Sequence, residues 1–258
     1  MELMTKSAAA LAAVFTLASP AVADQLCIKA TGATRSIRIR AAGCKPTEIA
    51  LGSFDGTTLQ LSGINLQVVS GTGATDGAVN GRGNLIVGYN EDDGRDRTGS
   101  HNLVLGRNNG YSGFGGIVSG DENQIANQGS VIASFDSEAT DGGVVVGGFT
   151  NSASIGASAV FGGQNNIARG VGSTVVGGAS NTANGVAANV TGGTCNAAGN
   201  LPADPECTAS CGFAVCGATV SGGSGNSAVA DHATVSGGLE RSATGTDDWV
   251  AGPLFTDN

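Results

Sequence analysis

The six cysteines are the residues of this 258-residue chain with the clearest capacity for covalent chemistry. Cys27 and Cys44 lie near the start, and Cys195, Cys207, Cys211 and Cys216 form a later cluster. Because an even number of cysteines in an exported protein indicates disulfides, we expect a Cys27–Cys44 bridge. The later cluster allows three pairings, and Cys195–Cys211 with Cys207–Cys216 is our working hypothesis. Zinc is the less favoured alternative, because the C-x11-C-x3-C-x4-C spacing lacks paired C-x-x-C knuckles.

The other residues that could do chemistry form no motif. Loop 90–96 is rich in oxygen ligands, but its spacing misses the EF-hand pattern and Arg95 and Arg97 can neutralise it, so it is interpreted as a solvated loop. His101 and His232 are far apart and are interpreted as surface residues. Asp231 and Glu240 could form a glycosidase pair, but nothing in the sequence fixes their separation. No nucleophile elbow or phosphate loop is present. We therefore expect no catalytic residue, no metal site and no cofactor.

The first 23 residues have the pattern of an export signal. Lys6 lies in a short n-region, an apolar run follows over 8–18, and a small-x-small site ends at Ala23. Leu26 before Cys27 is too large for a lipoprotein cleavage site. The apolar run is too short for a permanent membrane anchor, and no later run reaches ~20 apolar residues. The sequence predicts a chain that is secreted, or displayed at a bacterial cell surface, without a transmembrane segment.

Composition points to a repeat architecture with a thin core. The chain has 44 Gly but 5 Pro, with 40% hydrophobic, 13% charged and 4% aromatic residues. Scarce Pro without a three-residue Gly period excludes collagen, and the hydrophobic content argues against disorder. Few aromatics argue against a broad globular core. An ordered chain packed from small residues remains, and such chains are usually built from stacked repeats.

Charge separates the start of the chain from the rest. Residues 24–52 carry five Lys or Arg and two Asp or Glu, whereas 53–258 carry six Arg and 18 Asp or Glu. The acidic bulk argues against a nucleic-acid partner. The basic start is interpreted as a solvated strand face, with docking on an acidic neighbouring subunit as the alternative.

From residue 83 the chain repeats itself, mostly every 15 residues, as in VVVGGFTNSASIGAS followed by AVFGGQNNIARGVGS. A Val stands two residues before the first Gly of each pair, an Ala stands six residues after it, and an Asn precedes most of these Ala by two. These positions are Val145, Val160, Val175, Val190, Val220 and Val235; Ala126, Ala153, Ala168 and Ala183; and Asn151, Asn166, Asn181 and Asn196. Each unit predicts two short strands, with Val and Ala facing inward and Asn forming a hydrogen-bonded ladder at a corner.

Stacking of these units predicts an all-β fold, a parallel β-roll or β-solenoid of about eleven coils over 83–252. It is preceded by a disulfide-closed β module at 24–52, then by strands and a Gly-rich linker over 53–82, and is followed by a tail at 253–258. Within 53–82, alternation predicts strands at 58–61 and 64–69. The double step between Gly192 and Gly222 is interpreted as an irregular coil that places Cys211 in the Asn column.

The residues that flank the inward valines are apolar in the middle coils and polar in the late ones. Val144, Val146, Phe161 and Val176 should form an exposed apolar patch, which usually marks an interface. The open strand edges at the ends of a roll also invite pairing with another chain. We therefore expect the protein to associate with itself, as a homotrimer or a filament.

The pattern G-x-x-N-x-A-x-G alternating with small-x-Val-x-G resembles the head repeat of trimeric autotransporter adhesins. The resemblance covers residues 83–252. It implies a left-handed β-roll packed as a trimer and displayed at a surface, where it binds glycans or matrix or host proteins without catalysis. No heptad stalk or C-terminal membrane strands follow, and the spacing is mostly 15 rather than the family's commoner 14, so anchoring by the family's route is not expected. The sequence predicts an exported structural or adhesive protein, with a surface-displayed binding head as the alternative and a polysaccharide-active solenoid as a second alternative.

Overall fold

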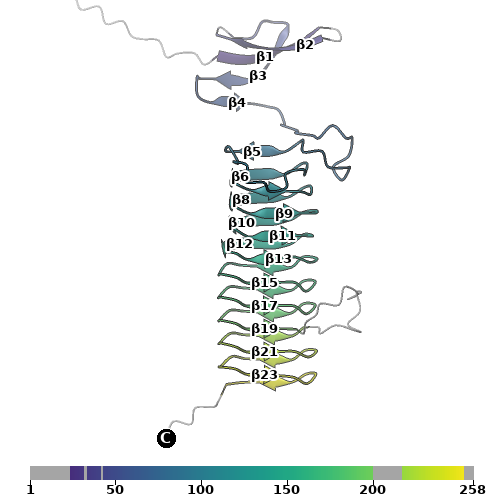
Figure 1. Cartoon of the computed structure of the whole chain (residues 1–258). Helices are drawn as coiled ribbons and strands as arrows, with labels where there is room; N and C mark the ends of the chain where they lie inside the picture. The colour runs from purple at the N-terminus through teal and green to yellow at the C-terminus, as the bar shows by residue number, and fades with distance from the viewer. Residues whose placement is uncertain (1–23, 32–33, 42, 200–216, 253–258) are drawn as a thin grey trace, which may run out of the picture. The chain divides into compact units, whose positions relative to one another are not determined.

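The computed structural model describes residues 24–31, 34–41, 43–199 and 217–252, and every regular element in them is a β-strand (Figure 1). The chain divides into two compact units, residues 1–67 and 68–258. The predicted signal segment, Cys207, Cys211 and Cys216, and the tail lie outside the described residues, so the expectations placed on them stay predictions.

The first unit is a four-stranded antiparallel sheet. Its strands are β1 (Asp24–Thr31), β2 (Thr34–Arg40), β3 (Glu48–Phe54) and β4 (Leu59–Leu61), in the order β2-β1-β3-β4. The Cys27–Cys44 disulfide is present, with the two Cα atoms 5.5 Å apart. The sheet continues past residue 52, because β3 ends at Phe54 and β4 pairs with it.

The prediction of a strand at 64–69 is wrong. Residues 64–69 form no strand, and Ile64, Leu66, Val68 and Val69 are exposed. Alternation alone does not make a strand, because the apolar side chains also need a sheet edge to pair with and a face to cover.

The second unit is the predicted parallel β-roll. Its larger sheet, here called the valine sheet, has eleven strands. They are β5 (Leu85–Val87), β6 (Leu103–Arg107), β8 (Ile117–Asp121), β10 (Val131–Phe135), β12 (Val144–Phe149), β14 (Ala159–Val160), β16 (Thr174–Val175), β18 (Asn189–Val190), β20 (Thr219–Val220), β22 (Thr234–Val235) and β24 (Trp249–Val250).

The second sheet of the roll, here called the alanine sheet, has nine strands and is also parallel. They are β7 (Gly110–Tyr111), β9 (Gln124–Ala126), β11 (Glu138–Thr140), β13 (Ser152–Ala153), β15 (Ile167–Ala168), β17 (Thr182–Ala183), β19 (Ala197–Ala198), β21 (Ser227–Ala228) and β23 (Ser242–Ala243). Nine coils contribute one strand to each sheet, whereas β5 and β24 at the two ends have no counterpart in the alanine sheet. Each strand pairs with its copy in the next coil (Figure 1).

The core between the two sheets is narrow and made of small side chains. The six valines and the alanines 153, 168 and 183 predicted to face inward have no exposed surface. A third buried column, which the sequence reasoning did not single out, lies just before each valine strand and consists of Ser158, Ser173, Ala188, Ala218 and Ala233. In the 15-residue coils the interior therefore holds one valine, one alanine, one small residue and the ladder Asn per layer.

The placement of Ala126 in the alanine column is wrong. Ile125 pairs with Ala139, and Ala139 pairs with Ala153, whereas Ala126 pairs with Thr140. The early coils have a single glycine at the corner, so counting six residues from it overshoots by one. The register of the valine sheet shifts between Ala133 and Phe135 of β10, opposite Gly147 and Gly148 of β12, where the corner gains one glycine. Longer coils begin there, and the insertion acts as a β-bulge.

The interpretation of the double step as an irregular coil is also wrong. Strand β18 pairs directly with β20, and β19 pairs directly with β21, so no coil lies between them. Asn226 follows Asn196 directly in the Asn column, 30 residues later instead of 15, so the premise that placed Cys211 in this column is wrong. The extra 15 residues equal one repeat, which is why the sequence suggested a coil here.

The second glycine of each Gly-Gly pair is the one that the stacking requires. Gly193 has φ +83°, and a Cβ added to it would lie 2.1 Å from the carbonyl oxygen of Gly223 in the next coil. A Cβ on Gly192 would meet no atom within 4 Å. The high glycine content therefore reflects, at this corner, both a left-handed backbone and close contact between successive coils.

Candidate interaction surface

The outer face of the valine sheet carries an exposed apolar column. Val146, Phe161 and Val176 each follow an inward valine in successive coils, and their exposed fractions are 46%, 48% and 49%. Val144 precedes the inward valine of the first of these coils and is half-buried. Since neighbouring coils are about 4.8 Å apart, the three exposed side chains form one continuous strip. The four residues predicted for the self-association face thus lie on one face of one sheet.

The apolar character of this face ends at β16. Earlier strands add Leu85, Val87 and Ile117, all exposed. From β18 onward the outward residues are Asn, Thr and Ser, until Trp249 on β24, which is 69% exposed. One sheet therefore presents two surfaces of different chemistry along the roll.

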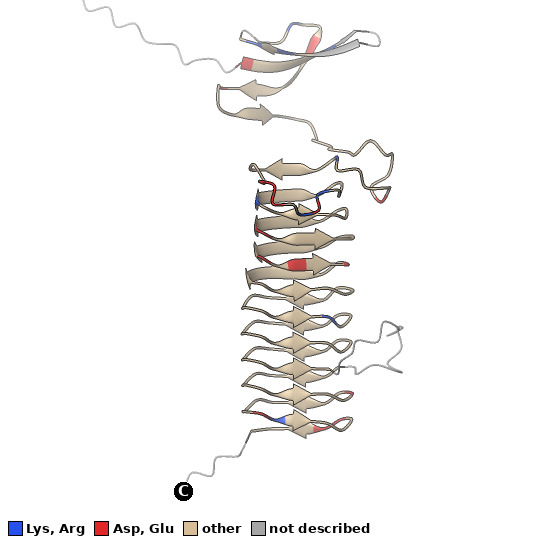
Figure 2. Ribbon diagram, in the orientation of Figure 1, with Lys and Arg blue, Asp and Glu red and all other residues tan. Residues whose placement is uncertain are grey.

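Charged side chains are nearly absent from the strands of the valine sheet (Figure 2). The two that occur, Arg107 and Asp121, stand at strand ends and pair with each other at 2.6 Å. Covering this face therefore buries no unpaired charge, which would otherwise oppose association.

The Asn ladder holds the coils, and hence this face, in register. The backbone N–H of Asn181 donates to Asn166 Oδ1 at 3.0 Å, and the N–H of Asn196 donates to Asn181 Oδ1 at 3.0 Å. Asn181 Nδ2 also donates to the carbonyl oxygens of Gly177 and Gly193, at 2.8 and 3.0 Å. Each asparagine of this kind therefore links three coils: its backbone N–H bonds to the preceding coil, and its side-chain amide bonds to its own coil and to the next.

The ladder is longer than the sequence predicted. It runs through Asn90, Asn109, Asn123, Ser137, Asn151, Asn166, Asn181, Asn196, Asn226 and Arg241. Its first members were missed because the early coils have 14 residues or fewer, apart from a longer first one. An Asn three residues after the single corner Gly, as in Asn109 and Asn123, was the signal available in the sequence.

The acidic loop is neutralised internally, as expected. Arg95 pairs with Asp93 at 2.9 Å, and Arg97 lies 3.7 Å from Asp92. Arg97 Nη1 also donates to the carbonyl oxygen of Asn90 at 2.7 Å. Within the residues that the structure describes, no group of three or more His, Cys, Asp or Glu side chains is placed to hold a metal ion.

The two histidines differ in their surroundings. His101 is partly buried rather than a surface residue: its Nε2 accepts from the N–H of Ser70 at 2.9 Å, and its Nδ1 lies 3.2 Å from the carbonyl oxygen of Thr75. It ties the preceding loop to the first coils. His232 is 62% exposed and lies 3.4 Å from an Asp247 oxygen.

Cys195 carries a free, exposed thiol. The structure therefore does not contain the Cys195–Cys211 bridge of the working hypothesis. Its physical basis was a coil that placed both cysteines in adjacent layers, and that coil does not exist.

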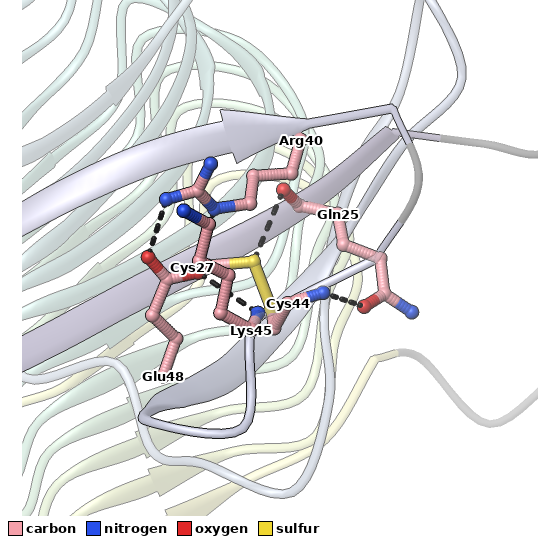
Figure 3. The surroundings of a disulfide bond; sticks show 6 residues. All are labelled: Gln25, Cys27, Arg40, Cys44, Lys45 and Glu48. Carbon is pink, nitrogen blue, oxygen red and sulfur yellow. Dashed lines mark hydrogen bonds and ion pairs between the residues drawn. A yellow bond between two sulfur atoms is a disulfide. The ribbon is translucent and has the colours of Figure 1, made fainter.

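The N-terminal disulfide lies in a polar cluster (Figure 3). The N–H of Cys44 donates to Gln25 Oε1 at 3.1 Å, and Arg40 makes two hydrogen bonds of 2.6 Å to the Glu48 carboxylate. The Lys45 N–H donates to Glu48 at 3.0 Å. The Arg40 hydrogen bonds, helped by the Lys45 amide, lower the pKa of Glu48 to about 2.

No protein-family model matches the chain, and no curated protein matches it. In the part of the chain that the structure describes, no helix is long and apolar enough to cross a membrane. The parallel β-solenoid is therefore established by the structure alone.

Proposed function

We propose that this chain is an exported structural or adhesive protein that associates with itself through the apolar part of the valine sheet, as a trimer or a filament. The observation that carries the proposal is the exposed column of Val146, Phe161 and Val176 on a sheet face without unpaired charge. Contiguous apolar surface of this kind usually marks an interface. The Asn ladder at the neighbouring corner holds the coils in register, so little order is lost when the face is covered.

Size-exclusion chromatography with light scattering on matched variants tests the proposal. Phe161→Glu places a charge in the column, and Ser221→Glu places the same charge at the equivalent outward position of a polar coil. We expect wild-type and Ser221→Glu chains to associate at micromolar concentration, and Phe161→Glu to lose the contact between rolls and to have a lower mass than either. A monomeric wild type, or equal masses for the two variants, contradicts the proposal.

Electron microscopy of the wild-type protein separates the two forms of assembly. Filaments favour association through the faces and open ends of the roll, where unpaired strand edges can add a further chain. Discrete particles under all conditions remove the filament and leave the trimer.

A surface-displayed binding head for glycans or for matrix or host proteins is the second candidate, and Trp249 favours it. Its indole is 69% exposed, and its Nε1 donates to Ser236 Oγ at 2.6 Å. An exposed aromatic ring beside rows of Thr and Ser hydroxyls can stack on a sugar ring and bond its hydroxyls. Binding of a defined glycan by the wild type that Trp249→Ala abolishes supports this candidate, and unchanged binding removes the role of Trp249.

A further inference from the structure

The N-terminal sheet has one face that is almost entirely apolar. Residues directly opposite each other in an antiparallel pair project to the same face of a sheet. Ile28 is opposite Ile37 on one side and Ile49 on the other, and Leu26 is opposite Ile39. Together with the pairs of β3 and β4, this defines the isoleucine face, formed by Leu26, Ile28, Ile37, Ile39, Ile49, Phe54, Leu59 and Leu61.

The polar groups of the module belong to the opposite face. Cys27, Arg40 and Glu48 alternate with the apolar residues along their strands, and Figure 3 shows them gathered around the disulfide. Among the side chains that the structure describes, Asp24 at the rim is the only charged one on the isoleucine face. The sheet is therefore amphipathic, with its polar side already stabilised by the disulfide and the Arg40–Glu48 ion pair.

The isoleucine face is uncovered. Ile37, Ile39, Ile49 and Leu59 are 64%, 60%, 63% and 54% exposed. Among the described residues of this unit, Cys27 is the only hydrophobic residue that is fully buried. A single sheet cannot enclose a core, because a stable domain needs a second packed layer. Modules of about 40 residues or fewer usually rely on disulfides, metals or oligomerisation, and this one already has its disulfide.

We propose that the second layer is the isoleucine face of another copy of this chain. Two such faces, packed about 10 Å apart, make a β-sandwich with both charged faces in solvent. A second copy fits because the central rows, Leu26 with Ile39 and Ile28 with Ile37 and Ile49, are apolar. A two-fold contact therefore meets charged residues only at the two ends of the rows, at Asp24 and Arg35. The inference goes beyond the proposed contact between rolls, since it uses different residues in a different unit.

The size of the face predicts a weak contact. Strands of 8, 7, 7 and 3 residues, at about 3.3 Å per residue and about 4.8 Å apart, give roughly 400 Å² per copy, against about 800 Å² per partner in a standard interface. Dimerisation through the module should therefore depend on concentration. Where the rolls also associate, the two contacts on one chain should reinforce each other.

Sedimentation equilibrium on the full chain in the Phe161→Glu background separates this contact from the roll contact. Ile49→Lys charges the isoleucine face, and Ala50→Lys places the same charge on the next residue of β3, which faces the other side with Cys27. We expect the Phe161→Glu chain, with or without Ala50→Lys, to form a concentration-dependent dimer. In the same background, Ile49→Lys should raise the dissociation constant of this dimer at least tenfold. Far-UV circular dichroism and an unreduced Cys27–Cys44 bridge, checked by mass, confirm that each variant is folded.

The results distinguish this inference from the proposed function. If the Phe161→Glu chain is monomeric at every concentration while the wild type associates, the module contact is refuted and the roll contact stands. If Phe161→Glu changes nothing but Ile49→Lys dissociates the protein, the module contact stands and the roll contact fails. Equal dimer dissociation constants for Ile49→Lys and Ala50→Lys, or a monomeric wild type, overturn the module contact.

Discussion

Replacing Asn181 by Ala should destabilise the roll by about 3–4 kcal/mol. The Asn181 side chain makes three hydrogen bonds, donating to Gly177 and Gly193 and accepting from the N–H of Asn196. It has no exposed surface, so water cannot replace these partners. Each lost bond costs about 1–1.5 kcal/mol net, which gives the total. Asn189 in the next coil is the matched control, because it is exposed and donates only to the carbonyl oxygen of Ala187.

Urea unfolding followed by circular dichroism measures the loss, and amide hydrogen exchange locates it. The Asn196 amide, whose acceptor is removed, should exchange much faster in Asn181→Ala. Exchange is needed because stacked repeats can unfold in segments, which makes a single global free energy incomplete. Asn189→Ala should stay within about 0.5 kcal/mol of the wild type. Equal stability of the two variants, or an unchanged Asn196 amide, would refute the ladder as a source of stability.

Three further changes test the packing and the N-terminal module. Gly193→Ala should cost more than about 1 kcal/mol, because the added Cβ meets the backbone of the next coil. Gly192 also has a positive φ, but a Cβ there meets no atom within 4 Å, so Gly192→Ala should cost less; thermal unfolding of the pair checks the order. Ala183→Leu should cost about 1–3 kcal/mol by overpacking a side chain with no exposed surface, whereas Thr182→Leu on the outer face of the same strand should be nearly neutral in urea unfolding. The ionised Glu48 stabilises the folded module, because its pKa is about 2 when folded and near 4.5 when unfolded. This stabilisation is complete above pH 4.5 and should be lost as the pH falls toward 2. Glu48→Gln should lack this acid-dependent loss when unfolding of the module is measured against pH.

The roll was predictable because its signal is periodic. Val160, Val175 and Val190 recur at one spacing among variable neighbours, and that pattern is enough to place a strand, its inward residue and its partner in the next coil. The Asn column was predictable for the same reason, since a buried amide that recurs at a fixed corner position can bond to its copies in the neighbouring coils.

The errors arose where the period changes. Ala126 was assigned by counting six residues from a corner glycine in a coil whose corner has one residue fewer, and Ile125 takes its place. Cys211 was assigned by adding 15 residues to Asn196, although the next Asn of the column is 30 residues on, at Asn226. Sequence spacing cannot tell an insertion from a coil, because only the pairing of the flanking strands decides it.

The isoleucine face could not be found from the sequence alone. Ile37 and Ile39 alternate within one strand, but their relation to Ile49 and Leu61 depends on strand order and on the bulge in β3. These are properties of pairing, which a short antiparallel sheet does not encode in a repeat.

Photo-cross-linking from position 176 tests the central claim most directly. A photoreactive phenylalanine derivative replaces Val176 in one chain and Ser221, on the same face in a polar coil, in the control. The account predicts covalent dimers or larger species on irradiation of the first protein and far fewer with the second. Monomer alone from position 176, or equal cross-linking from both positions, would contradict self-association through this face.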